Sequence, residues 1–195
     1  MWNERYSENE YVYGTEPNSF LIEHANLLVG PVLSLAEGEG RNAVFLASLK
    51  LDVLGVDASD VGLSKALKLA ESKGVTIHTE VADLTSYVPT ANCYGSVVSI
   101  FAHLPSEVRR RLYPLIEQSL KPGGTILLEA YAKSQLSRNT GGPKDADMLL
   151  TAADIKNEFP DCDVILCQEI EREVVEGTFH TGLASVVQFI GKKRG

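Results

Sequence analysis

The chain has 195 residues, 44% of them hydrophobic, which suits one globular α/β domain and is short for two. Its formal net charge of −8 argues against nucleic-acid binding, because proteins that bind nucleic acids neutralise phosphates with lysine and arginine. No apolar run approaches the roughly 18 residues that span a bilayer, so we expect no membrane association. The composition therefore favours a small molecule as the binding partner.

The first five residues carry mixed charge and no apolar stretch follows them, so we expect no signal peptide and a cytoplasmic location. Cys93, Cys162 and Cys167 are too few and too irregularly spaced for a disulfide framework. They also lack the spacing of zinc ligands, so we expect no metal site.

From about residue 31 onward, short β-rich runs alternate with helical patterns, which is typical of βαβ units and a parallel sheet. Strands are predicted at 32–35, 51–56, 76–81, 95–101, 125–130, 163–174 and 178–190, and helices at 41–49, 60–73, 106–120 and 152–159. The last two strands flank Glu176-Gly177 and indicate an antiparallel hairpin. The predicted fold is α/β: a Rossmann-like, doubly wound, seven-stranded sheet, mostly parallel with an antiparallel C-terminal hairpin and helices on both faces.

Two segments fall outside this alternation. Residues 1–30 are aromatic and polar and then form an amphipathic helix at 19–28, so we interpret them as an N-terminal cap segment on a domain of residues 31–195. The aromatic residues of this segment either close over a site as a lid or fix the first helix to the sheet; they are Tyr6, Tyr11, Tyr13 and Phe20. The polar stretch between residues 131 and 150 is longer than a usual connection, which predicts a lid or a mobile excursion.

A glycine-rich turn joins the first predicted strand to the first helix. Gly38 and Gly40 lack the β-carbons that would block a ligand from approaching the backbone. Asp57 ends the next strand, roughly 20 residues further on, where a carboxylate can accept hydrogen bonds from both hydroxyls of a ribose. Together these features predict a nucleoside cofactor. Asp57 can also be explained as a residue that only caps the following helix.

The charge of the turn bears on which cofactor it binds. A dinucleotide calls for G-x-G-x-x-G and a pyrophosphate at the helix N-terminus, whereas this turn reads A-x-G-x-G with Glu37 and Glu39 inside it. Two carboxylates repel a pyrophosphate but tolerate a cofactor that carries a sulfonium and an ammonium group. The turn therefore favours S-adenosylmethionine over NAD.

Several motifs resemble those of class I S-adenosylmethionine-dependent methyltransferases. The first is V-L-S-L-A-E-G-E-G-R-N-A at 32–43, where the family usually has V-L-D-L-G-C-G-E-G-R-N-A. The openings W-N-E-R-Y and Y-V-Y-G-T-E-P-N-S-F-L are similar to the branch of tellurite-resistance (TehB-like) and thiopurine-type methyltransferases. Later motifs follow in the family's order: G-V-D-A-S at 55–59, A-D-L at 82–84, F-A-H-L-P at 101–105 and L-K-P-G-G at 120–124.

The resemblance implies a role for each matching residue. Gly38 and Gly40 would face the methionine part of the cofactor, and Asp57 the ribose hydroxyls. Asp83 would meet the adenine amino group with Ala82 or Leu84 against the ring, although Asp83 can also be a simple turn residue. Ala58 belongs to the same G-V-D-A-S motif and completes the expected cofactor site.

Two residues of the first motif depart from the family. Ser34 stands in place of the usual aspartate, and Ala36 in place of the first glycine. The lost charge and the added methyl group put the cofactor affinity in question more than the identity of the cofactor. Glu37, in place of a cysteine, restores part of the negative charge.

Methyl transfer mainly requires that the nucleophile be held in line with the methyl group. His103 follows the fourth predicted strand, where it can take a proton from a substrate or merely cap the next helix. Four further residues are candidates for binding an anionic or soft nucleophile; they are Arg138, His180, Arg172 and Arg5.

The sequence thus predicts a methyltransferase that acts on a small soft nucleophile, with a tellurite or selenite oxyanion or a thiol as the leading acceptor. Three alternatives stay open: an O- or N-methyltransferase of a small metabolite, a non-catalytic module that binds S-adenosylmethionine, and, as the weakest, an NAD-dependent oxidoreductase. We expect a monomer or a weak homodimer.

Overall fold

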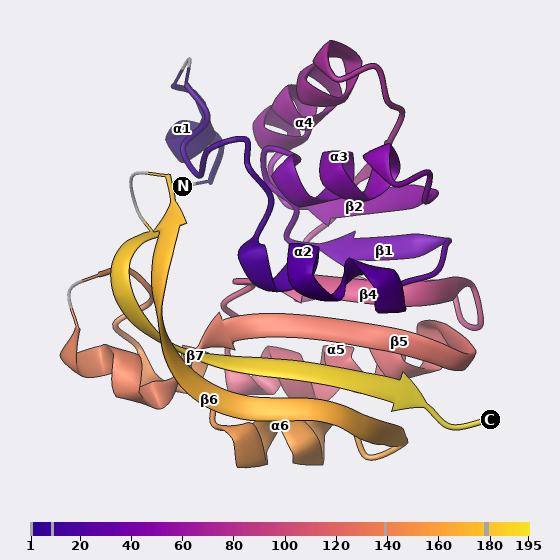
Figure 1. The fold of residues 1–195 in the computed structure, drawn as a ribbon, viewed down its shortest axis with the longest axis vertical. Coiled ribbons are helices and arrows are strands. Elements are labelled where there is room, and N and C mark those ends of the chain that lie inside the picture. Colours follow the sequence, from indigo (N-terminus) through magenta and orange to yellow (C-terminus); the bar gives the residue numbers. More distant parts are fainter. Residues whose placement is uncertain (1, 9, 139, 178–179) are drawn as a thin grey trace.

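The computed structural model describes residues 2–8, 10–138, 140–177 and 180–195, except for the side chain of His180. Its centre is a seven-stranded sheet in the order β3-β2-β1-β4-β5-β7-β6 (Figure 1). The strands are β1 (Val32–Leu35), β2 (Val53–Asp57), β3 (His78–Val81), β4 (Tyr94–Ile100), β5 (Leu120–Tyr131), β6 (Cys162–Glu176) and β7 (His180–Lys193).

The first five strands are parallel, and β7 runs antiparallel to both β5 and β6. The predicted fold, a mostly parallel sheet that ends in an antiparallel hairpin, is therefore confirmed. The predicted start of the last strand at Thr178 lies outside the described residues.

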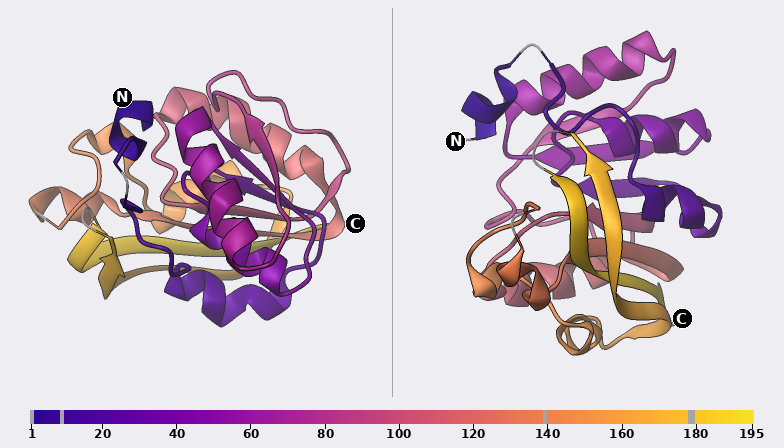
Figure 2. Two further views of the ribbon diagram at one scale, coloured as in Figure 1. Left: turned by 90° about the horizontal axis from the view of Figure 1, so that it is seen from above. Right: turned by 60° about the vertical axis from the view of Figure 1, so that its left-hand side comes forward.

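The helices are α1 (Trp2–Tyr6), α2 (Ser19–His24), α3 (Arg41–Ser48), α4 (Asp60–Ser72), α5 (Ser106–Ser119) and α6 (Ala152–Glu158). Alternate residues of each buried strand pack into two separate cores, because successive side chains of a strand point to opposite faces of the sheet. Val32 and Leu127 pack with α2, α3 and α4, whereas Leu33 and Leu128 pack with α5 and α6. The sheet is thus covered on both faces (Figure 2). None of the described helices is long and apolar enough to cross a membrane.

Several elements differ from their predicted bounds. β5 begins at Leu120 instead of residue 125, because Leu120 already pairs with Tyr94 before an irregularity in the register. The first amphipathic helix ends at His24 and continues as the 3-10 helix Ala25–Leu27. Helix α1 was not predicted, since a helix of five residues gives too weak a pattern.

The long connection after β5 contains two short 3-10 helices, Lys133–Ser137 and Ala146–Met148. Its second half is bound to the start of α5: Asp147 Oδ2 accepts from the N–H of Ser106 at 2.9 Å, and Arg109 donates to the carbonyl of Asp147 at 2.9 Å. These bonds hold the segment on the α5 and α6 side of the sheet.

The N-terminal segment is fixed to α4 mainly by one lysine. Lys65 Nζ donates to the carbonyls of Glu8 at 3.0 Å and Glu10 at 2.7 Å and pairs with the Glu39 carboxylate. The ammonium also lies 5.1 Å from the centre of the Tyr11 ring, a cation–π distance. A division of the chain at residue 30 stays a prediction.

Ala36 has a φ of +50°, in the left-handed region where a β-carbon is strained. We expect Ala36→Gly to raise the free energy of unfolding by about 0.5–1 kcal/mol, the relief of strain less the added backbone entropy of glycine in the unfolded chain. Urea denaturation measures this. The control Ala47→Gly also removes one methyl group, but within α3, and should lower the free energy of unfolding by a similar amount. A loss of stability in Ala36→Gly would contradict the assigned strain.

Candidate functional site

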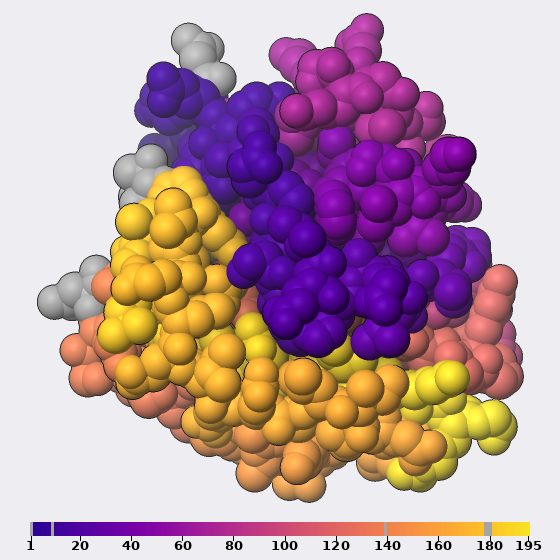
Figure 3. All heavy atoms as spheres, in the orientation of Figure 1, coloured from indigo at the N-terminus to yellow at the C-terminus, as the bar shows by residue number. Residues whose placement is uncertain are grey.

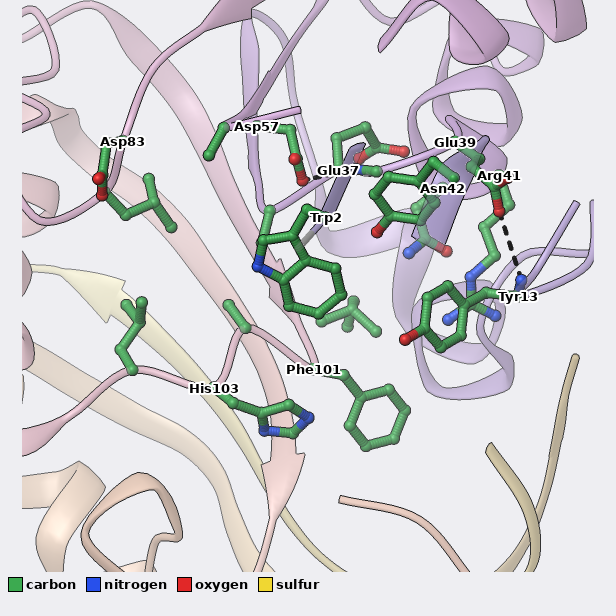
Figure 4. A pocket seen from close by; sticks show the side chains of 18 of the residues that line it. Trp2, Tyr13, Glu37, Glu39, Arg41, Asn42, Asp57, Asp83, Phe101 and His103 are labelled. Carbon is green, nitrogen blue, oxygen red and sulfur yellow. Dashed lines mark hydrogen bonds between the residues drawn. The ribbon is translucent and has the colours of Figure 1, made fainter. Parts of the chain in front are cut away.

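A pocket opens where β1, β2 and β4 end at the same edge of the sheet. The strand order reverses between β1 and β4, and in open α/β sheets this switch point is the place where ligands bind. Figure 4 shows the pocket and its labelled side chains. The lining residues are Trp2, Tyr6, Tyr13, Gly14, Ala36, Glu37, Gly38, Glu39, Arg41, Asn42, Asp57, Ala58, Asp83, Leu84, Ile100, Phe101, Ala102, His103 and Leu104.

The two glycines of the turn have different roles. Gly38 lines the pocket with a φ of +61°, and a β-carbon there would lie 2.7 Å from the hydroxyl of Tyr6. Gly40 is absent from the lining; a β-carbon there would lie 2.5 Å from that of Ala66, so this glycine lets α3 approach α4. The geometry therefore places Gly38, and not Gly40, where a ligand can reach the backbone.

Asp57 stands at the tip of β2 and is buried. Its Oδ2 accepts from the N–H of Gly38 at 2.9 Å and its Oδ1 from the N–H of Ser59 at 2.8 Å. Burial raises the pKa of this carboxyl. Because a carboxylate has about four acceptor positions, two bonds leave room for two donors from a ligand. The cap of α4 is Ser59, whose hydroxyl accepts from the N–H of Gly62 at 3.0 Å.

Asp83 and Leu84 follow β3 and line the far end of the pocket. Asp83 is exposed, and its Oδ1 accepts from the N–H of Thr85 at 2.8 Å, which lowers the pKa of its carboxyl. Asp83 is thus a turn residue that also lies at the pocket. Ala82 is absent from the lining and packs against the core beneath α5.

Glu37 is buried in the wall formed by the turn. The hydroxyl of Ser34, itself buried behind this wall, donates to Glu37 Oε2, and Oε1 accepts from the N–H of Ala43 at 2.8 Å. Burial raises the pKa of Glu37 to about 7. Glu37 therefore places a carboxyl group beside Ser34 at the end of β1, where Ser34 itself has none.

Glu39 faces the N-terminal segment. Its Oε2 accepts from the N–H of Val12 at 2.8 Å, and Oε1 pairs with Lys65. Because the lysine neutralises this charge, Glu37 is the remaining glutamate of the turn that can disfavour a pyrophosphate.

The aromatic residues of the N-terminal segment divide between the pocket and the core. Trp2, Tyr6 and Tyr13 line the pocket, whereas Phe20 is buried in the core and the Tyr11 hydroxyl donates to the carbonyl of Lys65 at 3.2 Å. In the space-filling view the N-terminal segment lies beside the β6–β7 hairpin (Figure 3). The two meet closely, since a β-carbon on Gly177 would lie 2.2 Å from the carbonyl oxygen of Val12.

The opposite wall is the loop after β4. Phe101 has a φ of +52°, and the ring of His103 stacks on that of Tyr131 with centroids 5.3 Å apart. Arg109 holds this loop, because it donates to the carbonyl of Leu104 at 2.7 Å and pairs with Glu158. His103 thus lies in the pocket in a defined orientation (Figure 4).

Three of the other predicted acceptor-binding residues, Arg138, Arg172 and Arg5, do not line the described pocket. Arg138 donates to Ser185 Oγ at 3.0 Å and pairs with Glu171. Arg172 pairs with the buried carboxylate of Glu129. Arg5 donates to the hydroxyl of Tyr13 at 3.0 Å and lies 4.9 Å from the centre of the Trp2 ring, behind the pocket wall. The side chain of His180 lies outside the described part of the chain.

The sequence analysis did not assign Arg41, Asn42, Phe101 or Trp2 to the site. Arg41 Nη2 pairs with Glu176 at 2.5 Å, and Asn42 Oδ1 accepts from the N–H of Asn18 at 3.0 Å. Arg41 and Asn42 directly follow the glycines within the quoted first motif, and Phe101 directly follows β4. Those positions were the available signal. Among the described residues there is no cluster of histidine, cysteine, aspartate and glutamate able to hold a metal.

The buried Glu37 predicts a specific dependence of stability on pH. The folded protein keeps Glu37 protonated up to about pH 7, whereas the unfolded chain ionises it near 4.5, so its contribution to stability is lost as pH rises between these values. We expect Glu37→Gln to remove this slope and to be more stable than wild type at pH 8 by on the order of 1–3 kcal/mol. Chemical denaturation at pH 5 and pH 8 measures both effects.

Glu39→Gln is the matched control, because it breaks the ion pair with Lys65 and should destabilise the protein at both pH values. A Glu37→Gln protein less stable than wild type at pH 8 would mean that the Glu37 carboxylate is stabilised where it lies.

A family model described as a methyltransferase domain matches residues 32–124. Among curated proteins, the chain is 26% identical over 117 residues to the 2-heptyl-1-hydroxyquinolin-4(1H)-one methyltransferase of Mycobacteroides abscessus, covering 58% of this chain and 52% of that protein. It is 29% identical over 123 residues to phosphoethanolamine N-methyltransferase 1 of Arabidopsis thaliana, covering 62% and 25%. The chain spans about half the length of the first relative and a quarter of the second.

Solved structures share the fold over nearly the whole chain. A structure described as the conversion of a disulfide bond into a thioacetal group during echinomycin biosynthesis has a TM-score of 0.78 at 18% identity, covering 98% of this chain and 89% of that chain. TehB from Haemophilus influenzae has a TM-score of 0.75 at 18% identity, covering 99% and 66%. NodS from Bradyrhizobium japonicum, in complex with S-adenosyl-L-homocysteine, has a TM-score of 0.73 at 12% identity, covering 100% and 97%.

These likenesses agree with the motifs and with the position of the pocket at the switch point of the sheet, and they confirm the family predicted from the sequence. Residues 32–124 of this chain match the model of a methyltransferase domain, and together with the curated relatives this match supports a class I S-adenosylmethionine-dependent methyltransferase.

Proposed function

We propose that this protein transfers a methyl group from S-adenosylmethionine to a small, soft nucleophile bound in the pocket at the ends of β1, β2 and β4. One observation carries the proposal. Within the family domain, the backbone of Gly38 and the carboxylate of Asp57 are bonded to each other in the wall of a single pocket, with Asp83 and Leu84 at one end and His103 at the other.

The residues present suit the cofactor. Asp57 keeps acceptor positions for ribose hydroxyls, Leu84 offers an apolar surface for an adenine ring, and Gly38 lines the pocket where the amino-acid part would lie. Trp2 and Tyr6 lie beside this wall and can exclude water from it. When bound, S-adenosylmethionine supplies an electrophilic methyl group on a cationic sulfur.

The charge of the lining favours a thiol over a tellurite or selenite oxyanion. Of the four carboxyl groups that line the described pocket, Glu39 is paired with Lys65 and Glu37 stays protonated up to about pH 7, so Asp57 and Asp83 carry most of the negative charge. The one guanidinium of the described lining, that of Arg41, is already bonded to Glu176. An oxyanion would enter the pocket as an anion and meet net negative charge there, whereas a thiol can enter uncharged. The echinomycin-related neighbour, described by the conversion of a disulfide bond into a thioacetal group, is consistent with sulfur chemistry on this fold.

A hydroxyl acceptor is the second candidate. His103 lines the pocket, its ring is oriented by stacking on Tyr131, and a neutral imidazole can take the proton from a hydroxyl as the methyl group is transferred. The Mycobacteroides relative is named for a hydroxyquinolone, an acceptor of this kind. An amine acceptor and a non-catalytic cofactor-binding module stay as alternative functions. For the protein itself we propose a cytoplasmic location and a monomeric or weakly dimeric state.

Replacement of Asp57 by alanine tests the cofactor site. Asp57→Ala should weaken the binding of S-adenosylhomocysteine by about 1–3 kcal/mol, because two ribose hydroxyls lose a charged acceptor. Isothermal titration calorimetry measures the change. Asp52→Ala is the control: this exposed aspartate precedes β2 at the opposite end of the strand, and its replacement should leave binding unchanged. Binding of NADH in place of S-adenosylhomocysteine would revive the oxidoreductase alternative.

Replacement of His103 by alanine separates the two acceptor classes. Wild type is assayed by mass spectrometry against thiols, phenolic hydroxyl compounds, selenite and tellurite, with methylation of thiols expected and none of the oxyanions. His103→Ala should lower turnover with a hydroxyl acceptor by about 100-fold or more but change turnover with a thiolate only a few-fold. Its affinity for S-adenosylhomocysteine reports an intact site. Efficient methylation of tellurite by wild type would overturn the thiol assignment.

A further inference from the structure

The two glutamates of the glycine-rich turn are both buried, but their neutralisation differs. Glu39 pairs with Lys65, whereas the hydrogen-bond donors to Glu37 in the described structure are the hydroxyl of Ser34 and the N–H of Ala43. Arg41, a cation close enough to act on Glu37, is bonded to Glu176 instead. A buried carboxylate without a bonded cation is costly, and such groups are concentrated at functional sites.

The surrounding chain is arranged to hold Glu37 at the end of β1. Ser34 donates to one carboxylate oxygen and Ala43 to the other, so both oxygens are oriented. Gly55 of β2 leaves the space that the side chain occupies, because a β-carbon there would lie 3.0 Å from Glu37 Cγ. Glu37 also lines the pocket beside Gly38, whose backbone suits the amino-acid part of the cofactor (Figure 4).

We propose that Glu37, instead of residue 34, carries the carboxylate that recognises the ammonium group of the cofactor, with Ser34 reduced to positioning it. This inference rests on the proposed function. The ligand's ammonium group provides the cation that Glu37 lacks, so the ionised form of Glu37 is the form that binds. The competing explanation is structural: Glu37 accepts from Ala43 in the first turn of α3 and serves only as a substitute cap, since Gly40 has no side chain.

The test compares two ligands that share a nucleoside. S-adenosylhomocysteine has the ammonium group, and 5′-methylthioadenosine lacks the whole amino-acid part. The quantity compared is the dissociation constant of 5′-methylthioadenosine divided by that of S-adenosylhomocysteine. In Glu37→Gln we expect this ratio to fall at least about tenfold, because the variant loses a charge-assisted hydrogen bond to the ammonium group. Calorimetry measures both constants. An equal weakening of both ligands, or no change in the ratio, would leave Glu37 as a cap and overturn the inference.

Two further variants separate this outcome from others. Glu39→Gln makes the same change in the same turn, and because Glu39 is bonded to Lys65 its ratio should stay within about twofold of wild type. A tenfold fall in the Glu39→Gln ratio would overturn the assignment to Glu37. Asp57→Ala should weaken both ligands together and so leave the ratio unchanged. Failure of wild type to bind either ligand would overturn the proposed function itself.

The pH dependence of the ratio in wild type provides a second measurement. Because burial places the pKa of Glu37 at about 7, the ratio should rise about tenfold between pH 6 and pH 8 and then level off. Several charged and titratable groups face Glu37 or share its described pocket; they are Arg41 of α3, Asp57 of β2, Tyr6 of α1, Tyr13, Glu39 of the turn, Asp83 after β3 and His103 after β4. Glu37→Gln keeps all of these, so the same rise in that variant, or a flat ratio in wild type, would overturn the inference.

Discussion

A buried cluster of ions connects parts of the chain that are distant in sequence, and the pocket depends on it. Arg41 at the start of α3 pairs with Glu176 at the end of β6, and Arg172 of β6 pairs with Glu129 of β5. Asn18 donates to both Glu129 and Glu176 at 2.8 Å. Two positive and two negative charges therefore balance, which meets the condition under which charge can be buried. Removal of any one member would leave an uncompensated ion in the core.

This cluster sets the relative position of the two pocket walls. Through Asn18 it holds the N-terminal segment, which contributes Tyr13 to the lining, against the hairpin of β6 and β7. Through Arg41 it fixes the first turn of α3, to which the glycine-rich turn leads. The cofactor wall and the aromatic cover are thus parts of one hydrogen-bonded structure, although Asn18 and Glu176 are 158 positions apart.

The sheet was predictable because its signals are local. The alternation of apolar runs, the glycine punctuation and the capping residue Thr151 are all read within a few positions, and strand order then follows from the family resemblance. The roles of the charged residues were not predictable, because each depends on a partner far along the chain. Arg172 and Arg138 are residues of the type that binds anions, yet Arg172 pairs with Glu129 and Arg138 pairs with Glu171. Gly40 has the spacing of a ligand-binding glycine, yet Ala66 of α4 is the group that requires it.

The same distinction applies within the glycine-rich turn. From the sequence, Glu37 and Glu39 count as two equal charges against a pyrophosphate, and Glu37 differs only in standing where the family has a cysteine. Lys65, 26 residues beyond Glu39, neutralises one of them and leaves the other to Ser34. The pattern of residues could identify the family; only the packing could distinguish the two carboxylates.

The place of Trp2 has a practical consequence. It is the single tryptophan of the chain, it lines the pocket, and 39% of its surface is exposed. Its indole stacks on Tyr6 and lies beside the guanidinium of Arg5. The chain therefore contains one indole fluorophore besides its tyrosines, situated at the mouth of the site, and no second indole contributes to the tryptophan emission. Any ligand that displaces water from this mouth changes the polarity around the ring, so the natural sequence carries its own optical reporter of occupancy without a label or an engineered residue.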